Sequence, residues 1–141
     1  MKLKTAALAA TIVLGWSANL YADDSVYQAF GGQTGMVKVV DIFIDNVLAD
    51  PRIKDQFTHA DIPHLKEKLV EQFCALTGGP CTYTGKDMTT AHKGFGLHDA
   101  QFNALAEDLQ YAMDRQGIPF RTQNHLVSQL ASMEKQIVEA K

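Results

Sequence analysis

The chain is poor in several residue types and motifs that would point to a function. Its 141 residues include two cysteines, four prolines and one tryptophan, and the net charge of −3 comes without a basic block or stripe. A nucleic-acid backbone therefore finds no electrostatic docking surface. No alternating run predicts a strand, and the length fits one domain of roughly 100–200 residues. A multidomain enzyme and a nucleic-acid-binding protein are excluded.

The common catalytic signatures are also missing. The sequence has no Walker loop, dinucleotide fingerprint, Gly-x-Ser-x-Gly elbow or His-Glu-x-x-His motif. Nucleotide-binding enzymes, serine hydrolases of that type and zincins thus lack support. What remains for chemistry is a set of five histidines and the apolar faces of helices.

The first 22 residues differ from the rest. Lys2 and Lys4 precede an uncharged run from Thr5 to Trp16, and small and polar residues follow up to Ala22. This pattern is typical of a signal peptide, and the run is shorter than the roughly 20 residues that span a bilayer. We expect a leader over 1–22 and one domain over 23–141, periplasmic or secreted and without stable membrane insertion after cleavage. An uncleaved N-terminal anchor is the alternative.

The two cysteines, Cys74 and Cys81, stand seven positions apart across Gly78-Gly79-Pro80. An exported chain meets an oxidising compartment, where such a pair can form a disulfide. The alternative is two ordinary small apolar side chains. A zinc site is disfavoured because no second Cys or His pair has the required spacing.

Helical periodicity runs through the mature chain and predicts an all-α fold. A first helix is expected over Met36–Leu48, and a second is expected to begin after Asp61, with Pro63 in its first turn, and to end at Gly78. Asp99–Gln116 predicts a third helix. A fourth opens at Pro119 and continues with a core face of Leu126, Val127, Leu130, Met133, Ile137 and Val138.

The stretch from Cys81 to Leu97 is irregular and rich in glycine, with at most one short helix at about Met88–Lys93. His92 ends that helix, whereas His59, His64, His98 and His125 lie near the starts of longer helices in polar surroundings. From spacing alone, the favoured interpretation of His92 is a solvent-facing imidazole at the negative end of a helix dipole.

A series of ordered landmarks resembles the group 1 truncated haemoglobins. They are Phe30-Gly31-Gly32, Val39-Val40-Asp41-Ile42-Phe43, Val47-Leu48-Ala49-Asp50-Pro51, Leu76-Thr77-Gly78-Gly79-Pro80, Tyr83-Thr84-Gly85-Lys86-Asp87-Met88 and Ala91-His92-Lys93-Gly94-Phe95-Gly96-Leu97. The resemblance covers about Tyr27 to Ile137. It implies a two-over-two helical sandwich around haem b, with His92 as the proximal iron ligand.

The same resemblance implies the other residues around the cofactor. Phe43 and Ile44 on the first helix would form the distal wall with Leu65, Lys68, Leu69 and Phe73 on the second. Phe57 would pack near the haem edge, Tyr83 and Met88 near its rim, and Phe95 just beyond the ligand loop. Phe73 matches the position that lines the ligand tunnel.

The chain departs from the family pattern on the distal side. Ile44 stands where tyrosine is usual, and Leu65 and Leu69 stand where glutamine or another hydrogen-bond donor is common. Losing one hydrogen bond to iron-bound dioxygen costs on the order of 1–3 kcal/mol of binding free energy. The sequence therefore argues against tight oxygen storage and against nitric oxide dioxygenation, which needs a persistent oxygen complex. The binding of nitric oxide depends little on a hydrogen bond from the distal side chains.

Lys68 follows Leu65 by three positions, and some family members place an iron-ligating side chain at the matching position. Three roles stay open for it: a sixth iron ligand, a partner of a haem propionate at the pocket rim, and a solvated lysine.

The leading hypothesis is thus a haem globin that binds oxygen, nitric oxide and carbon monoxide, for transport or for redox detoxification of nitric oxide, nitrite or peroxide. Such enzymatic turnover needs an electron donor or reductase, which the sequence does not identify. A six-coordinate His92–Lys68 protein for electron transfer or sensing, and a helical interaction module without haem, are the alternatives. The expected oligomeric state is a monomer or weak dimer.

Overall fold

The computed structural model describes residues 24–140, which form helices joined by loops and contain no strand. The helical segments are α1 (Ser25–Ala29), α2 (Gly32–Ala49), the 3₁₀ turn η1 (Lys54–Phe57), α3 (Ile62–Leu76), α4 (Met88–His92), α5 (Asp99–Arg115), α6 (Phe120–Ala131) and α7 (Glu134–Val138). The expected all-α class is confirmed.

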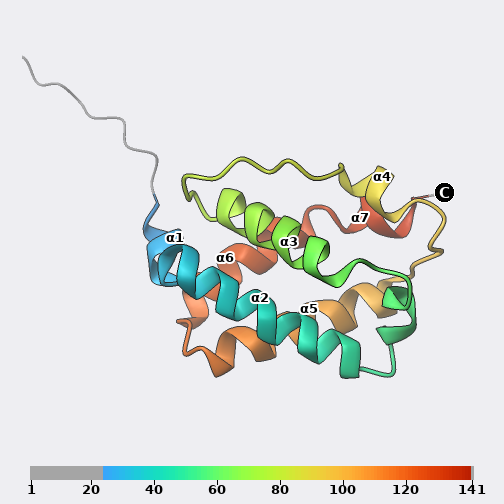
Figure 1. The fold of residues 1–141 in the computed structure, drawn as a ribbon, viewed down its shortest axis with the longest axis horizontal. Helices are drawn as coiled ribbons and strands as arrows, with labels where there is room; N and C mark the ends of the chain where they lie inside the picture. The colour runs from blue at the N-terminus through green and yellow to red at the C-terminus, as the bar shows by residue number, and fades with distance from the viewer. Residues whose placement is uncertain (1–23, 141) are drawn as a thin grey trace, which may run out of the picture.

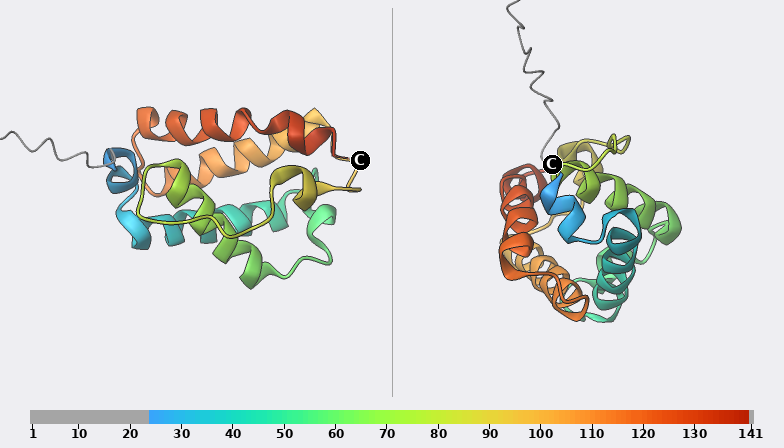
Figure 2. Two further views of the ribbon diagram at one scale, coloured as in Figure 1. Left: turned by 90° about the horizontal axis from the view of Figure 1, so that it is seen from above. Right: turned by 90° about the vertical axis from the view of Figure 1, so that its left-hand side faces the viewer.

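Four long helices form two layers. α2 packs against both α3 and α5, while α6 contacts α3 and α5 (Figure 1). Seen from above, α2 and α3 lie on one side and α6 and α7 on the other (Figure 2). The short helix α4 contacts α7, and the segment before it runs back along α3 (Figure 1). This is the two-over-two arrangement that the resemblance implies.

The helix boundaries follow from local chemistry. The Asp61 side chain accepts a hydrogen bond of 3.1 Å from the backbone N–H of His64 and so caps α3, with Pro63 in the first turn as predicted. Asp87 caps α4 in the same way through the N–H of Thr90, at 2.9 Å. Gly117 follows the end of α5 with a φ of 66°, a left-handed conformation that favours glycine.

The core lies where α2 crosses α3 and α5. One face of α2 is fully buried and contributes Met36, Val39, Val40, Phe43, Ile44 and Val47. Phe43 and Phe73 pack with ring centroids 6.2 Å apart and so join α2 to α3. The helical period of the sequence therefore identifies the buried faces correctly.

The predicted fourth helix is interrupted. α6 ends at Ala131 and α7 begins at Glu134, because residues 132 and 133 form a turn. The hydroxyl of Ser132 donates to the carbonyl of Gln129 at 2.6 Å, and such a side-chain bond competes with the helical backbone ladder. The single helix expected through Val138 was therefore wrong at this point. The short helix α1 was not expected at all.

Cys74 and Cys81 form the disulfide that the sequence left open. It joins the last turn of α3 to the loop before α4, with the two Cα atoms 5.8 Å apart. Gly79 allows the loop to pass closely, because a Cβ there would lie 2.6 Å from both the Cys74 sulfur and the Tyr27 ring. The disulfide thus fixes the start of the segment that leads to His92.

Within residues 24–140, no helix has the length and apolar character needed to cross a membrane. The predicted signal peptide over 1–22 lies outside the described residues.

Candidate functional site

A cavity of about 300 Å³ lies between α3, α4, α5 and α7, and its volume falls within the size range of ligand sites in proteins. Every helical segment except α1 contributes to its wall. Most of the lining is aliphatic or aromatic, with a few polar side chains at intervals. Such a cavity suits a large, mainly apolar ligand that is fixed by a small number of polar contacts.

His92 is the histidine of this cavity. Its Nδ1–H donates a hydrogen bond of 2.8 Å to the backbone carbonyl of Met88, one turn earlier in α4. This bond assigns the proton to Nδ1 and leaves the lone pair of Nε2 free to bind a metal. Of the remaining histidines, His59, His64, His98 and His125 are exposed and do not line the cavity.

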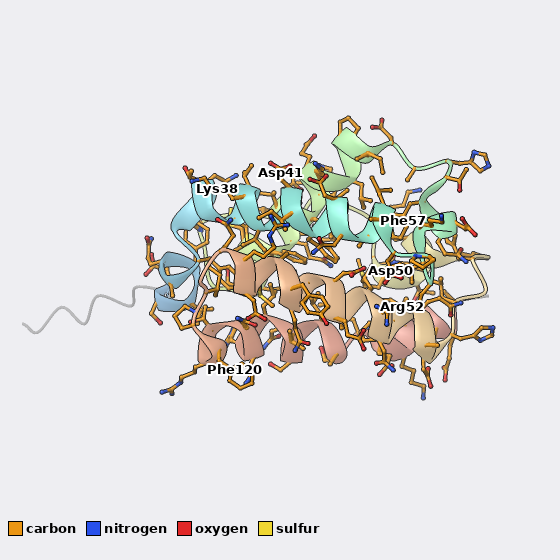
Figure 3. The ribbon with its side chains drawn as sticks, turned by 90° about the horizontal axis from the view of Figure 1, so that it is seen from below. Lys38, Asp41, Asp50, Arg52, Phe57 and Phe120 are labelled. Atoms are coloured by element: carbon orange, nitrogen blue, oxygen red, sulfur yellow. A yellow bond between two sulfur atoms is a disulfide. The ribbon has the colours of Figure 1, made fainter. Side chains whose placement is uncertain are left out.

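The structure brings almost all of the predicted site residues together. The cavity wall includes Phe43, Phe57, Leu65, Lys68, Leu69, Phe73, Tyr83, Met88, His92 and Phe95. Phe57 contributes to the wall from η1 (Figure 3 labels it). Ile44 is buried in the core and does not line the cavity. That these residues contact a cofactor stays a prediction.

The sequence analysis did not identify the part of the cavity wall that comes from α5, α6 and α7. α5 supplies Gln101, Phe102, Leu105, Ala106 and Leu109, and Leu130, Met133 and Ile137 follow from α6, α7 and the turn between them. Several of these positions had been assigned to core faces, because a cavity wall and a core have the same helical period. Six further lining residues have no sequence pattern that distinguishes them from their neighbours: Ile53, Gln56, Ala60, Gln72, Ala91 and Leu97.

Lys68 has its side chain in the wall and its amino group in a polar network. Nζ donates to Glu71 at 2.9 Å, to Thr84 at 2.8 Å and to Glu67 at 3.2 Å. The hydrogen bond to Glu71 raises the pKa of Lys68. Lys68 and Thr84 together lower the pKa of Glu71 to about 2. The amine is therefore held as an ammonium ion.

The donor set and the lining fit a haem group. An imidazole with a free Nε2 faces the cavity, and its tautomer is fixed by a backbone carbonyl, as in many metal-binding histidines. The aromatic and aliphatic wall suits the flat apolar macrocycle, and the placement of α4 by Asp87 sets the position of the imidazole. His92 would hold the iron, and the walls from α3 and α5 would enclose the ring.

Comparisons with known proteins identify the family of the chain. The family model described as "Bacterial-like globin" matches residues 25–139. The group 1 truncated haemoglobin of Tetrahymena pyriformis is 36% identical over 94 residues, 67% of this chain and 78% of its own. That of Mycolicibacterium paratuberculosis is 34% identical over 113 residues, 80% of this chain and 83% of its own.

The solved structures show the same relationship. The crystal structure of the Tetrahymena pyriformis protein in the Fe(III) form superimposes with a TM-score of 0.77 at 32% identity, over 80% of this chain and 97% of that one. Sequence and fold therefore identify the same family. The chain belongs to the group 1 truncated haemoglobin family, whose members are haem-binding globins.

Proposed function

We propose that this chain is an exported haem b globin that binds diatomic gases at an iron held by His92. The haem supplies the iron position at which the gas binds reversibly. The observation that supports this assignment is the Nδ1–H bond from His92 to Met88, which leaves Nε2 available at the wall of an apolar cavity. The leader over 1–22 is part of the proposal, because it would place the domain in the periplasm or outside the cell.

The distal wall favours ligands that need no hydrogen bond. Leu65 and Leu69 present only carbon to the cavity, and Ile44 is buried and does not line it. The amide nitrogen of Gln72, which also lines the wall, donates to the sulfur of Met88 at 3.5 Å. Solved variants of the Tetrahymena pyriformis protein replace a tyrosine and two glutamines, which are separated by the same intervals as Ile44, Leu65 and Leu69. We infer weak retention of dioxygen and better retention of carbon monoxide and nitric oxide, with nitric oxide, nitrite or peroxide chemistry dependent on an external electron donor.

The first test is the absorption spectrum of the full chain after expression with export and haem supply. We expect high-spin ferric iron and rapid carbon monoxide binding by the ferrous form. His92→Ala should lose the haem or its normal spectrum, whereas His59→Ala, at an exposed position, should leave both unchanged. Folded protein that retains no haem would contradict the proposal and favour the interaction module.

Export has its own test. The mass of the purified protein should correspond to a chain that begins at Asp23. A full-length mass in the membrane fraction would favour the uncleaved anchor instead.

The second candidate is a six-coordinate haem with His92 and Lys68 as ligands. The presence of the Lys68 side chain in the cavity wall favours it. A low-spin spectrum that Lys68→Ala converts to high-spin would establish it. The bonds of the amino group to Glu71 and Thr84 make the open site the better supported of the two.

A further inference from the structure

The side chain of Lys68 occupies two environments at once. It belongs to the cavity wall with Leu65 and Leu69, on the same face of α3. Its Nζ, however, bonds to partners at the protein surface, since Glu67 and Thr84 are both exposed. The flexible stem of a lysine would allow the amine to leave these partners and enter the cavity. The polar partners therefore decide where the amine lies.

Lys68, Glu71 and Thr84 form a closed ring of hydrogen bonds. Oε1 of Glu71 accepts from Lys68 at 2.9 Å, and Oε2 accepts from both the backbone N–H and the hydroxyl of Thr84, at 3.0 and 2.8 Å. The Thr84 hydroxyl in turn accepts from Lys68 at 2.8 Å. With Glu67 as the third acceptor, all three protons of the ammonium group are satisfied.

Thr84 is a fixed acceptor, because its loop is anchored on both sides. Cys81 is bonded to Cys74 at the end of α3, and Asp87 begins α4. Between these points, the hydroxyl of Tyr83 donates to the carbonyl of Lys86 at 2.7 Å. The loop runs back along α3 and so brings Thr84 opposite Glu71 (Figure 1).

We propose that Glu71 and Thr84 are positioning residues that hold the Lys68 amine at the edge of the cavity and thereby keep a coordination position of the haem iron open. This inference rests on the proposed function. In their absence, Lys68 would release a proton to solvent and donate its lone pair to the iron, so that the site would change from gas binding to a closed, six-coordinate state. Glu71 and Thr84 would thus determine the specificity of the site without touching the cofactor.

The test uses the full chain loaded with haem and compares ferric spin state and carbon monoxide association. Glu71→Gln and Thr84→Val should each shift the spectrum from high-spin to low-spin and slow carbon monoxide binding by about tenfold, the factor expected when one charge-assisted hydrogen bond is lost. Adding Lys68→Ala to either variant should restore the high-spin spectrum and rapid binding. Thr84→Ser keeps the hydroxyl and should behave as the unmodified protein.

The matched control is the other ion pair of α3. Lys66 bonds to Asp41 of α2 at 2.9 Å and does not line the cavity (Figure 3 labels Asp41). Asp41→Asn therefore removes a comparable partner from a lysine on the same helix. It should leave the spin state unchanged, which separates the specific effect from a general loss of charge pairing.

The outcomes are distinguishable. High-spin spectra and unchanged carbon monoxide binding in both Glu71→Gln and Thr84→Val would overturn the positioning role while leaving the gas-binding function intact. A low-spin spectrum of the unmodified protein that depends on Lys68 would overturn it as well, because the amine would then not be held away. An unmodified protein that folds without retaining haem would overturn the proposed function itself.

Discussion

The buried carboxyl group of Asp108 on α5 lies near the carboxylate of Asp50, which accepts hydrogen bonds from Nε and a terminal nitrogen of Arg52 (Figure 3 labels Asp50 and Arg52). Asp108 is only 6% exposed, and its Oδ2 is the one buried side-chain oxygen or nitrogen without a hydrogen-bond partner in residues 24–140. Burial and the negative charge of Asp50 raise the pKa of Asp108 to about 6. The folded chain thus holds a proton that the unfolded chain releases near pH 4.

This pair predicts a pH-dependent stability. Because the folded state binds the proton more tightly, Asp108 stabilises the fold below pH 4, and that stabilisation is lost as the pH rises to about 6. Asp108→Asn should raise the free energy of unfolding at pH 8 by about 1–3 kcal/mol and change it little at pH 4. Urea unfolding at both values measures the effect. Asp45→Asn, at an exposed position of α2, is the control, and an equal gain there would contradict the assignment.

The cap of α4 should control how well His92 is held. Asp87→Ala removes the acceptor of the Thr90 N–H and should cost about 1 kcal/mol of helix stability. Because His92 is the last residue of this short helix, we expect faster transfer of haem to an acceptor apoprotein. Asp87→Asn retains a capping oxygen and should keep the normal rate. Equal rates for the alanine and asparagine variants would show that the cap does not position His92.

The disulfide should contribute to stability through its short loop. Replacing both Cys74 and Cys81 by serine should lower the free energy of unfolding by about 2.5 kcal/mol, the chain-entropy value for a loop of this length. Chemical denaturation of the oxidised protein with and without a dithiol reductant provides the comparison. The reductant should destabilise the unmodified protein and leave the double variant unaffected.

A hydrogen-bond donor added to the distal wall should increase oxygen retention. Leu65→Gln places an amide in the cavity wall, and a gain of 1–3 kcal/mol would slow dioxygen dissociation by roughly 5- to 150-fold. Flash photolysis or stopped-flow mixing measures this rate. Carbon monoxide dissociation should change much less, and Ala75→Gln, on the exposed face of α3, should change neither. An unchanged dioxygen rate in Leu65→Gln would show that the amide does not reach the ligand.

The sequence was most informative where one local signal is strong. Asp61 and Pro63 mark the start of α3, and Gly117 marks the end of α5. Such signals can be recognised in a sequence because a cap or a left-handed glycine sets a helix end through residues only a few positions away. The turn at Ser132 was missed, because the apolar period continues through Met133 and Ile137 while the backbone does not. The helix α1 has five residues, too few for periodicity to indicate it.

The site was less accessible to pattern reasoning than the fold. His92 became a candidate ligand through the family resemblance, since its spacing alone also suits an exposed imidazole. Its bond to Met88 and the partners of Lys68 depend on three-dimensional placement of a loop that has no periodicity. The wall from α5 could not be separated from the core, because both require apolar residues at the same spacing.

The order in which the chain is made bears on how α4 reaches its place. The N–H of Gly94, just after His92, donates to the carbonyl of Ala140 at 3.2 Å, and α4 packs against α7. The segment that carries the imidazole is therefore completed by residues synthesised much later. The imidazole side of the cavity therefore depends on two segments that lie far apart in the sequence. Folding of the segment around α7 is consequently needed before the imidazole side of the cavity is complete.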